Sequence, residues 1–272
     1  MSKKPFEPDK AYENSDFLKS PGARPVRLLS EYLEPMLRFE ELNVRDTILV
    51  FGSARILPRD IAEAELAAAK KSGEEVAAAE RALDMSRYYE DARELAFRLT
   101  EWSKQLQDGS GRRFVICTGG GPGIMEAANR GASEARGDNM GLGISLPMEQ
   151  SNNPYITRRL SMQFHYFFMR KFWFLYLAKA VVIMPGGFGT LDELFESLTL
   201  VQTRKVRKHL PIVLYGTEFW DSVINLEAMV NYGTISAVDL ELIHHSDSVD
   251  DAFDHITSEL TRFAVDLPGM GL

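Results

Sequence analysis

The segment PGGFGTLDE, residues 185–193, combines three glycines, a threonine and a glutamate at short spacing. A run of β-branched apolar residues precedes it and an apolar period of three to four residues follows it, which predicts a strand, a glycine turn and a helix. Glycines let backbone amides approach a ligand closely, and the amino end of a helix favours an anion. The pattern therefore predicts a phosphate site at Gly186, Gly187, Gly189 and Thr190.

Thr190 is predicted to be the N-cap of this helix, where its hydroxyl either caps the helix or bonds a phosphate oxygen. Glu193 follows at the spacing of a capping box, in which the glutamate folds back onto the Thr190 amide and has no catalytic role. The carboxylate can instead act on a bound ligand. The spacing alone favours the capping box.

A second glycine loop, Gly119–Gly123, follows the apolar run 114–118. It does not fit the dinucleotide fingerprint, because Ile124 or Glu126 stands where the third glycine belongs. The sequence contains no Gly-Lys-Ser or Gly-Lys-Thr, so an ATP-cleaving P-loop is not supported. The loop remains a candidate for binding a nucleotide-like ligand through Gly120 and Gly121.

A third turn, Gly52-Ser53-Ala54-Arg55, follows the apolar run 47–51. The carboxyl ends of parallel strands share one edge of a sheet, where ligands bind. We therefore expect the three turns to lie near one another, with Ser53 and Arg55 close to the ligand. Arg55 is either a phosphate partner or a solvated loop arginine.

Short apolar runs alternate with helical segments along most of the chain, which predicts a Rossmann-like α/β fold with a doubly wound, mainly parallel sheet and helices on both faces. The expected strands are 47–51, 114–118, 140–146, 181–184, 211–215 and 240–243. Residues 162–179 are predicted to form a helix with aromatic side chains nearly all round. Such a helix must be buried on several sides, so we expect a homodimer or higher homo-oligomer.

The length of 272 residues fits one large domain, assigned to residues 23–272. Residues 1–22 are polar and contain three prolines, and we expect them to form a disordered or draped arm. Residues from about 58 to 108 are rich in Ala, Glu, Lys and Leu, and are expected to form a helical embellishment of the domain.

The net charge of −8 argues against a nucleic-acid-binding surface. Cys117 is the only cysteine, so no intrachain disulfide can form, and it is expected to be a small core residue. The amino terminus lacks the apolar core of a signal peptide, and the most apolar stretch, 172–184, is too short to span a bilayer. We therefore expect a cytoplasmic protein that does not bind membranes.

Three motifs in the same order resemble the LOG family, the cytokinin riboside 5'-monophosphate phosphoribohydrolases, which are also labelled lysine decarboxylase-like. They are the GGGPGIME loop at 119–126, the pair Arg170–Lys171 and the PGGxGTxxE segment at 185–193. The resemblance spans roughly residues 47–263. The chain is most similar to the longer bacterial subgroup, since the short plant-type members lack the amino-terminal arm and the segment 58–108.

The resemblance implies hydrolysis of the N-glycosidic bond of a purine nucleoside 5'-monophosphate, giving free base and ribose 5-phosphate. Glu193 and Arg170 match the catalytic glutamate and arginine of the family. Glu126 is then expected to contact ribose hydroxyls or help place the base. Lys171 is either a substrate contact or a charged residue whose stem lies along an apolar helix. No cofactor and no metal is expected.

Two alternatives remain open on the sequence. A protein with this fold can bind nucleotides without cleaving them. A lysine decarboxylase needs a lysine that forms a Schiff base with pyridoxal phosphate, and the sequence contains no recognisable motif for that cofactor. Whether the substrate is N6-prenylated AMP, AMP itself or another monophosphate also remains open.

Overall fold

The computed structural model describes residues 8–106, 111–145 and 152–269. Its seven strands form one parallel sheet with the order β4-β3-β2-β1-β5-β6-β7. The strands are β1 Thr47–Phe51, β2 Val115–Thr118, β3 Asn139–Ile144, β4 Ser161–Phe164, β5 Ala178–Ile183, β6 Ile212–Tyr215 and β7 Ile243–Ser246. The order reverses direction between β1 and β5, which is the topological switch point of a doubly wound sheet.

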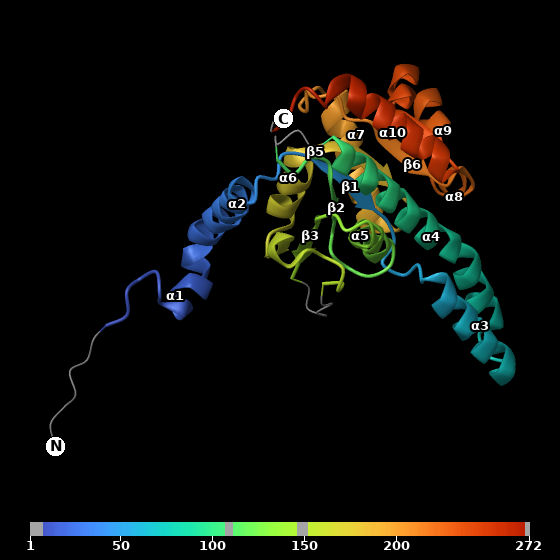
Figure 1. Ribbon diagram of the computed structural model, residues 1–272, viewed down its shortest axis with the longest axis horizontal. Helices are drawn as coiled ribbons and strands as arrows, with labels where there is room; N and C mark the ends of the chain where they lie inside the picture. Colours follow the sequence, from blue (N-terminus) through green and yellow to red (C-terminus); the bar gives the residue numbers. More distant parts are fainter. Residues whose placement is uncertain (1–7, 107–110, 146–151, 270–272) are drawn as a thin grey trace.

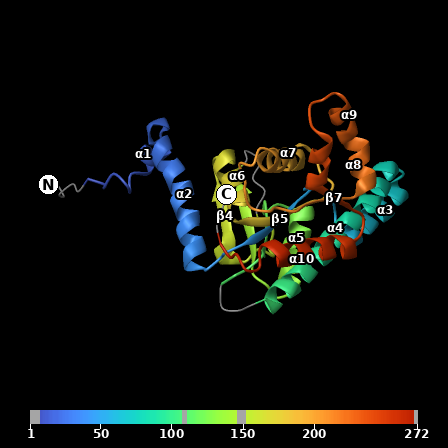
Figure 2. The same ribbon diagram turned by 90° about the horizontal axis from the view of Figure 1, so that it is seen from above.

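Helices cover both faces of this sheet, which confirms the predicted fold class (Figures 1 and 2). The α-helices are α1 Ser15–Lys19, α2 Arg24–Glu41, α3 Arg59–Ser72, α4 Val76–Gln105, α5 Ile124–Glu134, α6 Phe167–Leu177, α7 Phe188–Gln202, α8 Thr217–Val223, α9 Leu226–Asn231 and α10 Val249–Phe263. Short 3-10 helices are η1 Pro21–Ala23, η2 Arg158–Leu160 and η3 Ala237–Leu242. None of the helices described is long and apolar enough to cross a membrane.

Alternate residues of each buried strand supply two separate hydrophobic cores, as the two-residue period of a strand requires. In β1, Leu49 and Phe51 pack with α2, α6 and α7, whereas Ile48 and Val50 pack with α4, α5 and α10. Figure 2 shows α4, α5 and α10 on one side of the sheet and α6 and α7 on the other. The sheet is thus buried between two helical layers.

Helix α2 projects with α1 from the body of the molecule, and it contacts the body through α6 (Figure 1). Pro35 lies inside α2 and has no N–H, so the carbonyl of Glu31 loses its usual helical donor. The indole Nε1 of Trp173 donates to this carbonyl at 2.9 Å. A proline that would normally weaken the helix therefore becomes the point at which α2 is fixed to α6.

Several predicted boundaries differ in the structure: Ala178 and Lys179, expected at the end of a helix, begin β5, so the strand expected over 181–184 starts earlier. The helix expected over 162–179 was wrong at its start, because Ser161–Phe164 forms β4 and pairs with β3. The strand is only four residues long and only two residues separate it from the aromatic helix α6, and so short a run shows no clear period. The strand expected over 240–243 lies later, at Ile243–Ser246, because η3 extends to Leu242 and two histidines make the strand look polar.

The segment 58–108 contains α3 and the 30-residue α4. Helix α3 and the first turns of α4 extend away from the sheet (Figure 1), while the remainder of α4 packs against α5. The backbones approach closely at Gly131, where an added Cβ would lie 1.9 Å from the carbonyl oxygen of Arg93. Glycine is required there by lack of space.

We predict that Gly131→Ala lowers the free energy of unfolding by about 2–4 kcal/mol, although alanine is the better helix former. The cause is the forced separation of α4 and α5. Chemical denaturation measures the change. Gly22→Ala is the control, because the nearest atom to its Cβ is Ser20 Oγ at 3.8 Å, and it should shift stability by less than about 0.5 kcal/mol. Equal stability of the two variants would contradict the proposed clash.

Candidate active site

Backbone hydrogen bonds join the three turns at the carboxyl edge of the sheet. Met184 N donates to Phe51 O at 2.8 Å, and Ser53 N donates to Pro185 O at 3.0 Å. Ile124 N, at the start of α5, donates to Ser53 O at 3.0 Å. The turns after β1, β2 and β5 are therefore held in contact beside the switch point, where such folds bind ligands.

The turn after β5 exposes backbone amides at the start of α7. Gly187 is the N-cap, and the first helical hydrogen bond runs from Leu191 N to Gly187 O at 3.0 Å. The amides of residues 188–190 consequently have no partner within the helix. A Cβ added to Gly187 or Gly189 would meet no atom within 4 Å, so the space in front of these amides is open. This end of α7 can bind an anion.

The predicted N-cap role of Thr190 was wrong, because Thr190 lies inside α7, three residues after the N-cap Gly187. Its hydroxyl turns back onto the preceding turn: a Cβ on Gly186 would lie 2.1 Å from Thr190 Oγ1. Gly186 thus makes room for this hydroxyl. The capping box also fails, since it needs Thr190 at the N-cap, and Glu193 is free of that local role.

Glu193 and Arg170 form a buried pair between α7 and α6. Glu193 Oε1 lies 4.0 Å from Arg170 Nη2, and the two side chains are 7% and 14% exposed. Burial raises the pKa of Glu193 from 4.5 to about 7 and outweighs the attraction of Lys171 and Arg170. Burial likewise lowers the pKa of Arg170, against the attraction of Glu193. A carboxyl group that titrates near neutrality is suited to catalysis.

Arg170 also faces the second glycine loop. Its Nη1 lies 3.9 Å from the position of a Cβ on Gly119, and the rings of Phe167 and Phe174 flank its guanidinium at 5.1 and 5.4 Å. Arg170 Nε is buried and has no hydrogen-bond partner among the described residues. Arg170 therefore lies between Glu193 and the Gly119 loop, and its Nε–H is available to donate a hydrogen bond.

Buried asparagines fix the second glycine loop. Asn153 Nδ2 donates to the carbonyls of Gly120 and Gly121 at 3.2 and 3.1 Å and to Asn129 Oδ1 at 2.9 Å. Gly120 N donates to Thr118 Oγ1, so this amide is committed to the loop itself. Neither Asn129 nor Asn153 was among the site residues predicted from the sequence. A polar residue on the packed face of α5 was the available signal for Asn129.

Lys171, like its neighbour Arg170, faces α7 but forms closer ion pairs there. Its ammonium lies 2.9 Å from both Asp192 and Glu196, and it joins α6 to α7. Burial acts to lower the pKa of Lys171, but hydrogen bonds to the two carboxylates outweigh it and raise the pKa. The structure thus gives Lys171 a structural ion pair and does not bring it to the open space before the α7 amides.

The first turn places the side chain of Arg55 beside the other two turns. Ser53 Oγ accepts a hydrogen bond from Arg55 N at 3.1 Å. The side chain of Arg55 is exposed and forms no ion pair with a residue that the structure describes. Arg55 is therefore able to reach a ligand at the turn, while Ser53 mainly holds the turn together.

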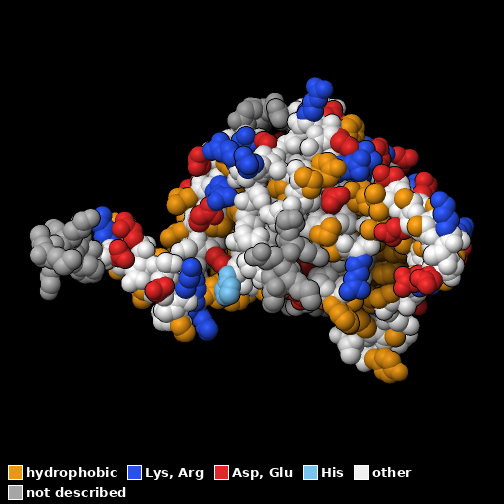
Figure 3. Space-filling view, turned by 90° about the horizontal axis from the view of Figure 1, so that it is seen from below, with side chains coloured by type: hydrophobic (Ala, Val, Ile, Leu, Met, Phe, Trp, Pro, Cys, Tyr) orange, Lys and Arg blue, Asp and Glu red, His pale blue; other side chains and the backbone are white. Residues whose placement is uncertain are grey.

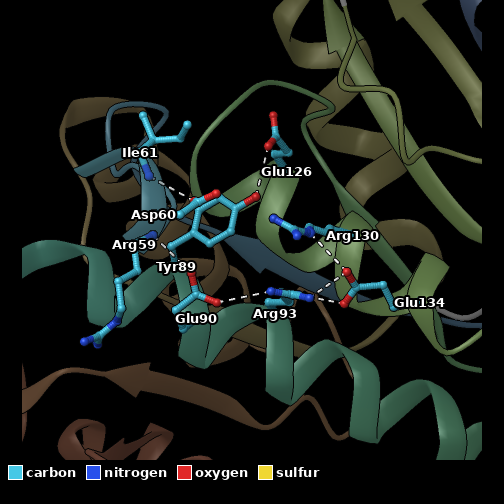
Figure 4. Close-up of polar contacts among 9 residues, drawn as sticks. All are labelled: Arg59, Asp60, Ile61, Tyr89, Glu90, Arg93, Glu126, Arg130 and Glu134. Atoms are coloured by element: carbon cyan, nitrogen blue, oxygen red, sulfur yellow. Dashed lines mark hydrogen bonds and ion pairs between the residues drawn. The ribbon is translucent and has the colours of Figure 1, made fainter. Parts of the chain in front are cut away.

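Glu126 lies on α5, and the side chain of Tyr89 reaches it from α4 (Figure 4). Its Oε1 accepts a hydrogen bond from Tyr89 OH at 2.9 Å, and Tyr89 is completely buried. Burial raises the pKa of Tyr89, so the phenol stays a neutral donor. Figure 4 also shows Arg93 of α4 bonded to Glu134 of α5, at 2.7 Å. Tyr89 was missed because it lies in the segment interpreted as an embellishment.

The family model described as "Possible lysine decarboxylase" matches residues 125–256. The matched region contains the Arg170–Lys171 pair and the segment 185–193. The resemblance of this chain to the LOG family is thereby confirmed.

A pyrimidine/purine nucleotide 5'-monophosphate nucleosidase of Escherichia coli (strain K12) is 31% identical over 114 residues, which are 39% of this chain and 25% of that protein. The match thus spans a quarter of the length of this relative. Two solved structures are also similar: a molybdenum cofactor carrier protein of Chlamydomonas reinhardtii (18% identity, TM-score 0.46, 79% of this chain and 99% of that chain) and a molybdenum cofactor binding protein of Rippkaea orientalis (17%, 0.43, 79% and 98%).

The raised pKa of Glu193 predicts a pH-dependent stability. Because the folded pKa of about 7 exceeds the ordinary 4.5, the folded state binds more protons between these values, and wild-type stability falls as pH rises through this window. Glu193→Gln has no carboxyl group to ionise at this position, so its stability does not fall in this way. Its free energy of unfolding relative to wild type should increase by up to about 3 kcal/mol from about pH 5 to about pH 8. Urea titrations at both pH values measure this, with exposed Glu65→Gln as the control. Parallel pH dependence of wild type and Glu193→Gln would rule out the raised pKa.

Proposed function

Taking this chain as a LOG-like protein, we propose that it hydrolyses the N-glycosidic bond of a purine nucleoside 5'-monophosphate, giving free base and ribose 5-phosphate. The observation that carries the proposal is Glu193, a buried carboxyl group with a pKa of about 7 that lies 4.0 Å from Arg170 and on the same helix as the open amides of residues 188–190. An anion site next to such a carboxylate suits a phosphorylated sugar.

In the proposed mechanism the amides at the start of α7 bind the 5'-phosphate, assisted by Arg55 from the first turn. Cleavage develops positive charge on the ribose ring, and the ionised Glu193 stabilises that charge or orients the attacking water. The water oxygen bonds to C1', the bond from C1' to the base nitrogen breaks, and the base leaves with a proton. Arg170 holds the phosphate or assists the departing base.

Glu126 is proposed to contact the ribose hydroxyls, with Tyr89 positioning its carboxylate through the 2.9 Å hydrogen bond. The similarity to a nucleosidase whose name includes both purine and pyrimidine nucleotides supports the class of 5'-monophosphates. Within this class we propose AMP or an N6-modified AMP as the substrate. Tests therefore need both kinds of base.

The decarboxylase named by the family description fits these residues less well. A Schiff base forms from a neutral amine, whereas the ammonium of Lys171 is held by Asp192 and Glu196, which raise its pKa despite burial. Lys179 lies near Asp46, at 3.6 Å, and donates to Leu267 O. Burial lowers the pKa of Lys208 to about 7, but its amine donates to the carbonyls of Leu175 and Tyr176, at the amino edge of the sheet.

We predict that the purified protein releases base and ribose 5-phosphate from AMP and N6-isopentenyl-AMP faster than from CMP, as followed by chromatography. Glu193→Gln should lower kcat by about 10²-fold or more, because it removes the negative charge that faces the developing cation. The matched control Glu65→Gln makes the same change at an exposed carboxylate on α3 and should alter kcat by less than about threefold. If ionised Glu193 is required, kcat/KM should rise with pH to a plateau above about 7.

Equal activity of Glu193→Gln and wild type would remove Glu193 from the mechanism. If AMP stabilises the protein against heat and no base is released, the chain is instead a nucleotide-binding protein. Faster release from CMP would contradict the purine preference and leave the nucleosidase chemistry intact.

We also propose that the chain forms a homodimer through the start of α6 and α7. Phe167 and Phe168 are 51% and 59% exposed, and Phe188 is 92% exposed. Figure 3 shows hydrophobic side chains at the surface of this protein in several patches, including the projecting amino-terminal arm. Large exposed aromatic side chains on neighbouring helices are typical of protein interfaces.

Light scattering should therefore give twice the chain mass of 30.7 kDa. Phe168→Asp should shift the protein toward the monomer, because it places a charge in the apolar contact. Tyr232→Asp is the control, since Tyr232 is 86% exposed on the distant end of α9. A monomeric wild type, or a dimer unaffected by Phe168→Asp, would exclude this interface.

A further inference from the structure

A cavity of about 520 Å³ lies at the amino edge of the sheet. Its walls are the loop 203–211 before β6, the junction of η3 with β7, and two residues of α10, His255 and Glu259. Because the strands are parallel, this edge is opposite the one that carries the three turns. The volume is in the range of small-molecule sites.

The loop wall carries arginines whose charge is not used elsewhere. Arg204 and Arg207 line the cavity, are exposed, and form no ion pair or side-chain hydrogen bond with any residue in the described part of the chain. The neighbouring Lys208 differs, since its ammonium donates to the carbonyls of Leu175 and Tyr176 at 2.6 and 3.0 Å. In a chain of net charge −8, two such free arginines at one cavity favour an anionic ligand.

The opposite wall is built from imidazole rings. His244 and His255 stack with centroids 3.8 Å apart and an interplanar angle of 5°. His244 Nε2 is bonded to Asp251, whereas His255 has no hydrogen-bond partner within the described residues. Burial, and then the neighbouring His244, lower the pKa of His255. The imidazole of His255 is therefore neutral and can donate one hydrogen bond to a ligand.

The acidic residues that line this cavity do not offset the positive charge of Arg204 and Arg207. Glu259 is bonded to His209, so its carboxylate already has a partner on the loop wall. Glu241 is exposed at the rim. The buried side chains of Val206, Leu210 and Ile243 form an apolar floor. An apolar floor with a few convergent polar groups is the usual composition of a ligand site.

We propose that this amino-edge cavity binds a small phosphorylated molecule, at a site separate from the candidate active site. Arg204 and Arg207 contact the phosphate oxygens, since a guanidinium matches the geometry of phosphate. His255 supplies a further donor, and the apolar floor receives the organic part of the ligand. This proposal does not depend on the nucleosidase activity proposed above.

Isothermal titration with inorganic pyrophosphate tests the charge recognition. The double variant Arg204→Gln/Arg207→Gln should weaken pyrophosphate binding by about tenfold or more, because charge-assisted contacts are lost. The matched control Lys70→Gln/Lys71→Gln removes two exposed charges on α3 and should keep the wild-type affinity. Unchanged affinity in the arginine variant, an equal loss in both variants, or no binding at about 1 mM pyrophosphate would each overturn the proposal.

Histidine ring signals in NMR spectra locate the bound ion. Pyrophosphate should shift the signals of His244 and His255, assigned through His244→Gln and His255→Gln. His165 follows β4 at the carboxyl edge and serves as an internal reference. Shifts at His165 alone would place the ion at the opposite, carboxyl edge of the sheet and would refute the amino-edge site even if the nucleosidase proposal holds.

Discussion

The close approach of the turn after β1 to the start of α5 is the constraint on which the candidate site depends. A Cβ on Gly52 would lie 2.6 Å from the side chain of Ile124, and a Cβ on Gly123 would lie 2.3 Å from the carbonyl oxygen of Ser53. Glycine at both positions allows Ser53 to accept from Ile124 N while its own N–H donates to Pro185 O. One residue thereby fixes both glycine loops, and the gap between them becomes a defined space.

Two buried charged clusters in this protein show why the Glu193 pair is interpreted as functional. At the amino edge, Asp46 is bonded to Arg113, whose other donors reach the carbonyls of Ala264 and Val265. The charged groups of that cluster are hydrogen-bonded, and they fix the carboxyl-terminal segment to the sheet.

At the carboxyl edge, Arg170 Nε has no partner in the described chain, and Glu193 keeps only a 4.0 Å contact with Arg170. A fold seldom leaves buried polar groups unpaired without a further reason, and a substrate is the reason proposed here.

Much of the fold follows from local patterns in the sequence. Five apolar runs and the two glycine loops were placed correctly, because the runs are mostly apolar and glycines lie within or directly after them. The strand β4 was not predictable, since four residues carry too little pattern. The N-cap was misplaced by three residues, because a threonine hydroxyl is able to cap a helix, whereas in the structure the Thr190 hydroxyl faces Gly186.

The partners of the candidate residues were less predictable than the residues themselves. Glu126 and Arg170 were found from motifs, whereas Tyr89 and Asn153 reach the site from segments 37 and 33 residues away in the chain from Glu126 and Gly120. Such contacts leave no periodic pattern in the sequence, because they form only when separate elements pack together.

The long segment between β1 and β2 is therefore not a uniform addition to the domain. Its first part, α3 and the start of α4, lies outside the two cores, whereas Tyr89, Ala92 and Leu95 are buried in the core beneath α5. The absence of a side chain at Gly131 lets α4 approach closely enough for Tyr89 to reach Glu126. The part of this segment that forms α4 thus packs against α5 and supports the second glycine loop. The position of Glu126 therefore depends on a helix that lies outside the sequence motifs.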